Sequence, residues 1–420
     1  MKKVLLRGPI LTQSGYGEHA RFLWRALQMF PERYEVFVEP LNWGQTSWLW
    51  ENDEERRQID ESIARCMVFR QQKGNFDIAF LVTIPNEWEK LAPINIGVTA
   101  GIETTKVAPE WIWKANTTVD KIIVPSKFSK EVFENTVYPV QDRQTGQNTV
   151  LKLSVPVEAV HYPVKEFEEV DLGLDLKTDF NFLCVAQWGP RKNIGETIKW
   201  FLEEFKDDNV GLVLKTSKAR NSTIDKMLVE KEIKEILSEF EDADRKCKIY
   251  LLHGYMNNDE LHSLYVHPKI KAIVNFGHGE GFGLPLFEAA YCEMPVIAHD
   301  FGGQKDFLFA PKKGKSNNKK LRSFFSNVVY ETRPVQKSAV WSGVIQSDSE
   351  WAYVNEQAAK MALRETYENY SLHKGKAKKL KKWILENFNS DEQHKKFVIA
   401  SGIHQEIDKE IEALFNELEI

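Results

Sequence analysis

Two glutamates, Glu280 and Glu288, stand with seven residues between them around a glycine-rich run. The preceding segment, Ala272–Phe276, has the apolar pattern of a buried strand, and Pro285 suits the first turn of a helix. Glycines between a strand and a helix let backbone N–H groups approach a ligand closely, and a helix N-terminus favours a phosphate. We expect Glu280 on the loop and Glu288 in the first helical turn. Two carboxylates beside a phosphate cradle indicate a sugar-nucleotide site.

This stretch resembles the Glu-x7-Glu motif of retaining GT-B glycosyltransferases, in particular their family 4 group. The match covers Glu280-Gly281-Phe282-Gly283-Leu284-Pro285, then Glu288-Ala289, Pro295-Val296-Ile297-Ala298 and Gly302-Gly303. The resemblance implies that Glu280 lies beside the anomeric carbon of the donor sugar and stabilises an oxocarbenium-like transition state. It also implies that Glu288 anchors the nucleotide ribose and that Gly281, Phe282, Gly283 and Leu284 bind the donor. The alternative for Glu288 is a helix cap, because acidic first-turn residues favour the helix dipole.

The chain has 420 residues, which suits two domains of about 200 residues each. Its composition, 42% hydrophobic and 28% charged, is typical of a soluble globular protein, and no stretch is apolar enough to span a bilayer. Charges interrupt Met1–Arg7 too early for a signal peptide, and the four cysteines are isolated. We expect a cytoplasmic protein, or a peripheral membrane protein, in the host cytoplasm if the chain is phage-encoded. The net charge of −5 argues against an overall polyanion-binding surface.

Apolar runs and helical patterns alternate in both halves, which predicts parallel sheets covered on both faces. The expected strands are Val4–Leu6, Tyr34–Val38, Phe76–Val82, Ile94–Thr99 and Lys121–Val124, then Phe182–Ala186, Val210–Leu214, Ile249–Leu252, Ala272–Phe276 and Val296–Ala298. The predicted fold class is α/β: two facing Rossmann-like doubly wound domains with a cleft between them, as in GT-B proteins. We expect domains at 1–165 and 166–385, with Lys165–Asp179 as the linker.

The C-terminal part reads as helical at Glu350–Glu368, Lys374–Glu386 and Asp391–Glu419. By the resemblance, residues 386–420 cross back onto the N-terminal domain.

The segment Gln187–Asn193 follows the first strand of the second domain, where Arg191 and Lys192 would neutralise a departing diphosphate. It is similar to the family's phosphate loop, in which an arginine precedes a lysine by a few residues. Lys192 matches that lysine, whereas Gln187 stands where the arginine is common. Either Arg191 substitutes for it or phosphate stabilisation is weaker. A solvated basic turn is the alternative interpretation.

Further candidate residues lie at other strand ends. Gly15, Tyr16 and Gly17 occupy a loop that in the family lies near the donor phosphates and the acceptor. The same loop imitates a dinucleotide fingerprint, but the residues between strand and glycine disfavour that interpretation. Glu103 would bind sugar or acceptor hydroxyls, or pair with a cation. His278 would contact phosphate or have no role in the site. Trp43, in the tryptophan-rich segment Asn42–Trp50, would either pack in the core or stack on an acceptor.

The sequence therefore predicts a metal-independent retaining glycosyltransferase that uses a nucleotide-diphosphate sugar, expected to be a UDP-sugar, and no other cofactor. Front-face displacement and a covalent intermediate are both compatible with this pattern. The acceptor is a glycan, a lipid-linked molecule or nucleic acid. Lys312–Arg322 is either a solvated loop or a contact for an anionic acceptor, and Asp242-Ala243-Asp244 reads as a solvated helix terminus rather than a metal site. Two alternatives are a phage-type enzyme that glycosylates DNA bases and an inactive nucleotide-sugar-binding protein.

Overall fold

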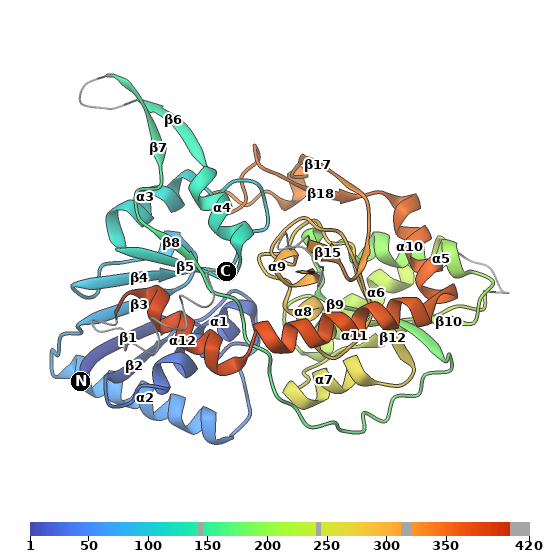
Figure 1. The fold of residues 1–420 in the computed structure, drawn as a ribbon, viewed down its shortest axis with the longest axis horizontal. Coiled ribbons are helices and arrows are strands. Elements are labelled where there is room, and N and C mark those ends of the chain that lie inside the picture. Colours follow the sequence, from blue (N-terminus) through green and yellow to red (C-terminus); the bar gives the residue numbers. More distant parts are fainter. Residues whose placement is uncertain (142–145, 241–244, 312–320, 404–420) are drawn as a thin grey trace.

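Two parallel sheets of six strands each lie side by side in the computed structural model of the chain, which describes residues 1–141, 146–240, 245–311 and 321–403 (Figure 1). Helices cover both faces of each sheet. The predicted α/β fold with two doubly wound parallel sheets is confirmed. The predicted helix terminus at Asp242–Asp244 and most of the basic run from Lys312 lie outside the described residues.

The N-terminal sheet has the strand order β2-β1-β3-β4-β5-β8, and all its pairs are parallel. Its strands are β1 (Lys2–Gly8), β2 (Tyr34–Pro40), β3 (Ile78–Val82), β4 (Ile94–Val98), β5 (Lys121–Val124) and β8 (Val157–Ala159). The connecting helices are α1 (Gly15–Gln28), α2 (Glu54–Gln71), α3 (Pro109–Thr118) and α4 (Lys127–Asn135), with a short 3₁₀ helix η1 (Pro85–Glu87). The carboxyl ends of these strands face the second domain.

A two-stranded antiparallel hairpin interrupts this domain between α4 and β8. It consists of β6 (Val137–Gln141) and β7 (Asn148–Lys152), and it projects away from the body of the protein (Figure 1). Most of its side chains are exposed. The sequence analysis did not predict it, because its strands lack the apolar alternation of a half-buried sheet.

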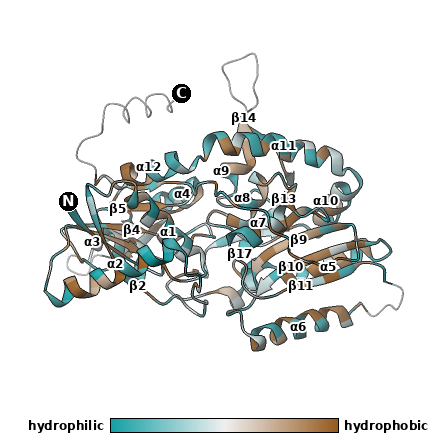
Figure 2. Ribbon diagram, turned by 90° about the horizontal axis from the view of Figure 1, so that it is seen from below, coloured by the Kyte–Doolittle hydropathy of each residue, from teal (hydrophilic) through white to brown (hydrophobic). Residues whose placement is uncertain are grey.

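The C-terminal sheet has the order β11-β10-β9-β12-β13-β16. Its strands are β9 (Phe180–Gln187), β10 (Val210–Ser217), β11 (Lys248–Leu252), β12 (Ile270–Asn275), β13 (Val296–Ala298) and β16 (Ser326–Asn327). Its helices are η2 (Pro190–Lys192), α5 (Ile194–Phe205), α6 (Thr223–Ser238), α7 (Asn258–Val266), α8 (Leu284–Tyr291) and α9 (Lys305–Leu308). Strands β9 and β10 are strongly hydrophobic, as expected for strands covered on both faces (Figure 2).

The segment after β16 corrects one prediction. Glu350–Glu368 was expected to be helical throughout, but Glu350–Val354 forms strand β18, which pairs antiparallel with β17 (Tyr330–Pro334). Helix α10 (Glu356–Glu368) begins only after Asn355, whose side chain caps it by accepting from the Ala358 N–H at 2.9 Å. Tertiary pairing with β17 therefore outweighs local propensity here. A second short antiparallel pair, β14 (Phe309–Pro311) with β15 (Leu321–Ser323), and the 3₁₀ helix η3 (Lys337–Ala339) complete this region.

The chain returns to the N-terminal domain at its described end. Helix α11 (Tyr370–Asn387) packs along α8, and α12 (Ser390–Ser401) then lies against α1 (Figure 1). The Phe397 ring of α12 meets the Phe22 ring of α1 edge to face, with centroids 5.0 Å apart. Residues 404–420 lie outside the described part of the chain. Within that part, no helix is long and apolar enough to cross a membrane.

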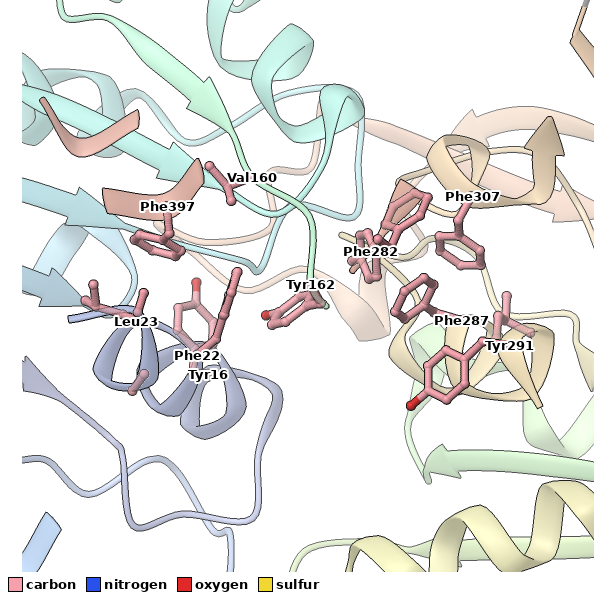
Figure 3. Packing of buried hydrophobic residues seen from close by; sticks show 14 of the residues in the cluster. Tyr16, Phe22, Leu23, Val160, Tyr162, Phe282, Phe287, Tyr291, Phe307 and Phe397 are labelled. Carbon is pink, nitrogen blue, oxygen red and sulfur yellow. The ribbon is translucent and has the colours of Figure 1, made fainter. Parts of the chain in front are cut away.

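A shared apolar cluster joins the two domains. Tyr162, in the segment between β8 and β9, lies between Phe22 of α1 and Phe282 of the C-terminal domain (Figure 3). Its ring centroid is 5.6 Å from that of Phe22 and 5.1 Å from that of Phe282. Phe282 in turn packs on Phe287 and Phe307. The segment between β8 and β9 therefore contributes a side chain to the core shared by the two domains.

Candidate active site

The carboxyl ends of the neighbouring strands β9 and β12 bring the predicted catalytic residues together. Arg191 and Lys192 lie in η2, directly after β9, and Glu280 lies on the loop between β12 and α8. Because β9 and β12 pair in parallel, both loops emerge at the same edge of the sheet. The adjacent Arg191 and Lys192 thus form one ionic cluster with Glu280, which is far away in the sequence.

Glu280 is buried, with 6% of its surface exposed, and three side chains hold its carboxylate. Lys192 Nζ donates to Oε1, and Asn275 Nδ2 donates to the same oxygen at 2.9 Å. Arg191 Nη1 lies 3.5 Å from Oε2. Burial alone would raise the pKa of Glu280, but the neighbouring Lys192 and Arg191 charges outweigh it and lower the pKa to about 2. The carboxylate is therefore a fixed negative charge.

Burial lowers the pKa of both cations, but their net pKa shifts are opposite. Burial, followed by the neighbouring Arg191 charge, lowers the pKa of Lys192, although Glu280 opposes this. For Arg191 burial acts in the same direction, but Glu103 and Glu280 outweigh it and raise the pKa. Arg191 therefore remains a permanent charge at the end of β9, whereas Lys192 depends on its anionic partner.

Arg191 also connects the two domains. Its Nη2 atom lies 3.4 Å from Oε1 of Glu103, which belongs to the N-terminal domain, and its Nη1 atom donates to the Gly279 carbonyl oxygen at 2.7 Å. Of the two predicted roles for Glu103, the structure shows pairing with a cation, and that cation is Arg191. A group bound at Arg191 would meet carboxylates from both domains.

The backbone of the loop around Gly281 lies directly against the backbone of the N-terminal domain. A Cβ atom on Gly281 would lie 2.1 Å from the Ala100 carbonyl oxygen, so only glycine fits there. The Gly281 carbonyl oxygen accepts a hydrogen bond from Ser126 Oγ at 2.6 Å. Gly283 has φ +91° and directly precedes α8, whose first residue is Leu284. The Phe282 side chain points into the apolar cluster (Figure 3), which leaves its backbone for a ligand.

Glu288 lies deeper along α8 than predicted. Helix α8 begins at Leu284, so Glu288 is its fifth residue and not part of the first turn; the cap interpretation is therefore wrong. Its Oε2 atom accepts from the Tyr265 hydroxyl at 3.1 Å, and its Oε1 atom lies 4.0 Å from Lys165 Nζ. Lys165 Nζ also pairs with Glu18 Oε1 at 2.9 Å. The linker lysine therefore bridges α8 and α1.

Gly15, Tyr16 and Gly17 were predicted to lie on a loop before the first helix, but they form the first turn of α1. Ser14 caps α1 by accepting from the Gly17 N–H at 3.0 Å, while Gly15 has open space around it. The Tyr16 hydroxyl bonds Thr99 Oγ1 at 2.6 Å and accepts from the Gly101 N–H at 3.1 Å. Trp43 packs on the Tyr16 ring, with centroids 4.2 Å apart. Tyr16 thus ties the start of α1 to residues 99–101, which adjoin Gly281.

Two other candidates have partners of their own. Gln187, at the end of β9, donates through Nε2 to the Lys218 carbonyl oxygen at 2.7 Å. His278 stacks on Trp351 at 4.8 Å, and its Nδ1 atom bonds the Ala352 carbonyl oxygen at 2.7 Å. Burial lowers the pKa of His278. These contacts give His278 a structural role in joining β18 to the Glu280 loop.

Sequence reasoning missed Asn275, Tyr265 and Lys165 as site residues. Asn275 is a polar residue that ends a strand of apolar ones, and this signal could have identified it. Tyr265 and Lys165 carry no such signal, because only the packing of α7 and the linker brings them to Glu288. Within the described residues, no group of three or more metal-ligating side chains could hold an ion.

Comparisons with known proteins fit this geometry. Sucrose-phosphate synthase from Thermosynechococcus elongatus superposes with a TM-score of 0.58 at 14% identity, covering 94% of this chain and 97% of that one. Anabaena HepE in complex with UDP-glucose gives 0.55 at 11% identity, covering 95% and 100%. The catalytic domain of starch synthase IV from Arabidopsis thaliana, bound to ADP and acarbose, gives 0.54 at 12% identity, covering 96% and 99%. The chain has the GT-B fold.

The sequence of this GT-B protein also matches a family. Residues 173–315 match the family described as "Glycosyl transferases group 1", and this segment contains Arg191, Lys192, Glu280 and Glu288. No curated protein sequence matches the chain. The resemblance to GT-B glycosyltransferases predicted from the sequence is confirmed, and the group 1 segment is the domain that carries the ionic cluster.

Proposed function

We propose that this GT-B protein is a retaining glycosyltransferase of the family 4 type that transfers a sugar from a UDP-sugar without a metal ion. The observation that carries the proposal is the ionised, buried Glu280, fixed by Lys192, Arg191 and Asn275 where the two domains meet. A fixed carboxylate at that position would stabilise positive charge at an anomeric carbon. The UDP-glucose bound to HepE and the ADP bound to starch synthase IV support a nucleotide ligand.

The cations would supply the complementary half of the chemistry. As the glycosidic bond breaks, negative charge develops on the diphosphate, and Arg191 and Lys192 lie where they would neutralise it. A bound diphosphate would compete with Glu280 for the Lys192 donors, so Lys192 would be shared between the two. Arg191 would take the role of the arginine that Gln187 replaces, since the Gln187 amide donates to Lys218. This charge pair is the reason for proposing that no metal ion is needed.

The acceptor would approach from the N-terminal domain. Glu103 of the N-terminal domain pairs with Arg191 of the cluster. In the same domain, the Trp43 ring packs on the Tyr16 ring. The neighbouring Trp48 and Trp50 rings are 45% and 75% exposed. Exposed aromatic rings suit a sugar, because the C–H face of its ring can stack on them while its hydroxyl groups donate to a carboxylate such as that of Glu103. We therefore propose a glycan acceptor in preference to nucleic acid or lipid.

The test is donor hydrolysis without acceptor. The protein is incubated separately with UDP-glucose, UDP-N-acetylglucosamine, UDP-galactose and GDP-mannose, and released nucleoside diphosphate is measured. We expect release from at least one UDP-sugar, with Glu280→Gln lowering the rate about 100-fold or more. Glu293→Gln is the matched control, because Glu293 is an ion-paired glutamate beside Lys374, outside the cluster. Donor binding without any release would instead support the inactive binding protein.

A further inference from the structure

Helix α11 (Tyr370–Asn387) concentrates positive charge in a protein that is acidic overall. The helix contains six lysines and one acidic residue, Glu386, so its net charge is +5. The whole chain has a net charge of −5, which leaves −10 for the rest of the chain. Lysines three and four residues apart on a helix repel one another and destabilise it. The run of lysines therefore calls for a partner outside the helix.

The lysines of α11 differ in how far their charge is compensated. Lys374 Nζ donates to the Glu293 carbonyl oxygen at 2.8 Å, and Lys381 Nζ lies 3.9 Å from the Glu293 carboxylate. Lys378 and Lys379, in contrast, are exposed and form no ion pair with any other residue that the structure describes. Their charges are therefore uncompensated within that part of the chain.

One stripe of α11 is open to solvent and carries both lysines and leucines. Its members, which we call the basic face, are Leu372, Lys378, Lys379, Lys382 and Leu385. Steps of three, four or seven residues connect them, and such steps keep side chains on one side of a helix. Leu372 and Leu385 are 57% and 44% exposed. A Cβ atom on Gly375, in the same stripe, would meet nothing within 4 Å, so no described element covers the stripe there.

The composition of the basic face suits an anionic lipid surface better than nucleic acid. Helix α11 contains no arginine, the side chain that recognises phosphates and bases with two parallel hydrogen bonds. Its Tyr370 and Trp383 rings are half-buried, so neither is fully available to stack on a base. At a lipid interface the exposed leucines leave water, while the ammonium groups stay among the headgroup phosphates.

We propose that the basic face of α11 docks the protein on an anionic lipid surface, with the helix axis parallel to that surface. The docked stretch Leu372–Leu385 is about 20 Å long. On the buried side of α11, Leu380 and Ile384 belong to the same apolar cluster as Phe287 of α8. Helix α8 begins directly after the Glu280 loop, so one helix layer would separate this element from the lipid. The lipid is a docking surface here, and the proposed acceptor remains a glycan.

The experiment is flotation of the full chain with lipid vesicles in the absence of any nucleotide sugar, so its outcome does not depend on the proposed function. Vesicles of phosphatidylcholine alone are compared with vesicles that contain about 30% phosphatidylglycerol, at about 0.1 M and about 0.5 M NaCl. We expect the wild-type protein to bind only the phosphatidylglycerol vesicles, at least about tenfold more weakly at the higher salt concentration. A DNA duplex is titrated in parallel as the competing polyanion.

Two variants locate the contact on α11. Combining Lys378→Gln, Lys379→Gln and Lys382→Gln should weaken vesicle binding about 100-fold, because each lysine near an anionic surface contributes to the attraction. Combining Leu372→Ser with Leu385→Ser keeps every charge and should weaken vesicle binding about tenfold, because less apolar surface leaves water. All five positions are exposed, and circular dichroism checks that each variant keeps the helical content of the wild type.

The matched control removes the same amount of charge from α6. It combines Lys226→Gln, Lys231→Gln and Lys234→Gln, all at exposed positions. Helix α6 also exposes Ile224 and Met227, by 72% and 63%, so the control tests a second helix with lysines and apolar side chains at its surface. Because α6 and α11 lie on opposite sides of the molecule (Figure 2), this variant should bind vesicles as the wild type does.

Four outcomes overturn the inference. The wild-type protein could bind neither kind of vesicle, or both kinds equally. The lysine variant of α11 could bind phosphatidylglycerol vesicles as the wild type does. The α6 variant could lose as much binding as the lysine variant of α11, which would leave net charge alone as the cause. The α11 lysines could be required for binding the DNA duplex and not for binding vesicles, which would make the basic face a nucleic-acid site.

Discussion

At the scale of single residues, Glu280 is distinguished by how completely its charge is compensated. Both carboxylate oxygens face cations, and Asn275 supplies a neutral donor to Oε1. A buried ion pair of this kind adds little net stability, but removing one partner leaves an unpaired buried charge, which costs roughly 3–5 kcal/mol. The cluster therefore adds little to protein stability. Its effect is to hold the Glu280 carboxylate as a fixed negative charge, which the proposed chemistry requires.

The dependence of protein stability on pH tests whether Glu280 is held ionised in the folded protein. The pKa of Glu280 falls from 4.5 to about 2 on folding. A lowered pKa contributes stability that is fully present above the unfolded-state value and is lost as pH falls towards 2. The difference between 4.5 and about 2 corresponds to on the order of 3 kcal/mol. We expect the difference in unfolding free energy between wild type and Glu280→Gln to shrink between pH 4.5 and pH 2, measured by urea denaturation. A difference that is constant over this range would show that the carboxylate is not held ionised.

The sequence also predicted the core of this site at the residue scale. Glu280, Arg191 and Lys192 could be singled out because strand ends and glycines locate loops that face a ligand, and the structure brings them into contact. Their pairing with one another was not predicted, nor was the part played by Lys165. Both depend on distances between loops that only tertiary packing sets.

At the scale of elements, the sequence predicted the strands of the two large sheets except β8 and β16, and it missed the short antiparallel pairs. Strands β5 and β13 are short and, apart from Lys121 of β5, apolar, and each lies where expected. Strand β18 was taken for the start of a helix, because Trp351, Ala352 and Tyr353 carry no helix-breaking signal. Its strand conformation comes from pairing with β17 and from the bond between the Ala352 N–H and the His278 carbonyl oxygen at 2.9 Å.

The segment between β17 and β18, residues 335–349, binds the N-terminal domain through hydrogen bonds and an ion pair; we call it the clasp. The Gly343 carbonyl oxygen accepts from Trp111 Nε1 at 2.9 Å and from Asn86 Nδ2 at 3.0 Å. Lys106 Nζ pairs with Asp348 at 2.7 Å. These bonds cross between domains without passing through the ionic cluster.

Trp111→Phe is expected to loosen this clasp. The substitution keeps a large buried ring on α3 but removes the donor to Gly343, which costs about 1 kcal/mol of unfolding free energy. Hydrogen exchange should become faster at residues 341–350, as followed by mass spectrometry. Trp113→Phe on the same helix is the control, since the Trp113 side chain is 54% exposed. Unchanged exchange in Trp111→Phe would show that this bond does not hold the clasp.

At the scale of the whole molecule, the site exists only where both domains meet. Glu103 and Ser126 come from the first domain, Arg191 and Gly281 from the second, and each side contacts the other. Helix α12 and Tyr162 add apolar contacts that hold the domains in register. An activity that requires Glu280 should therefore depend on how closely the domains approach.

Gly281→Ala tests that dependence directly. The added methyl group would lie 2.1 Å from the Ala100 carbonyl oxygen, which belongs to the other domain's backbone, so the domains would have to separate. We expect a larger radius of gyration by small-angle X-ray scattering and at least about a tenfold loss of donor hydrolysis, with the circular dichroism spectrum unchanged. Gly189→Ala is the matched control, because a Cβ atom there meets nothing within 4 Å and its φ is −172°, which any residue adopts. If Gly281→Ala keeps both the radius and the hydrolysis rate of the wild type, close approach of the two domains at this loop is not a condition for the chemistry.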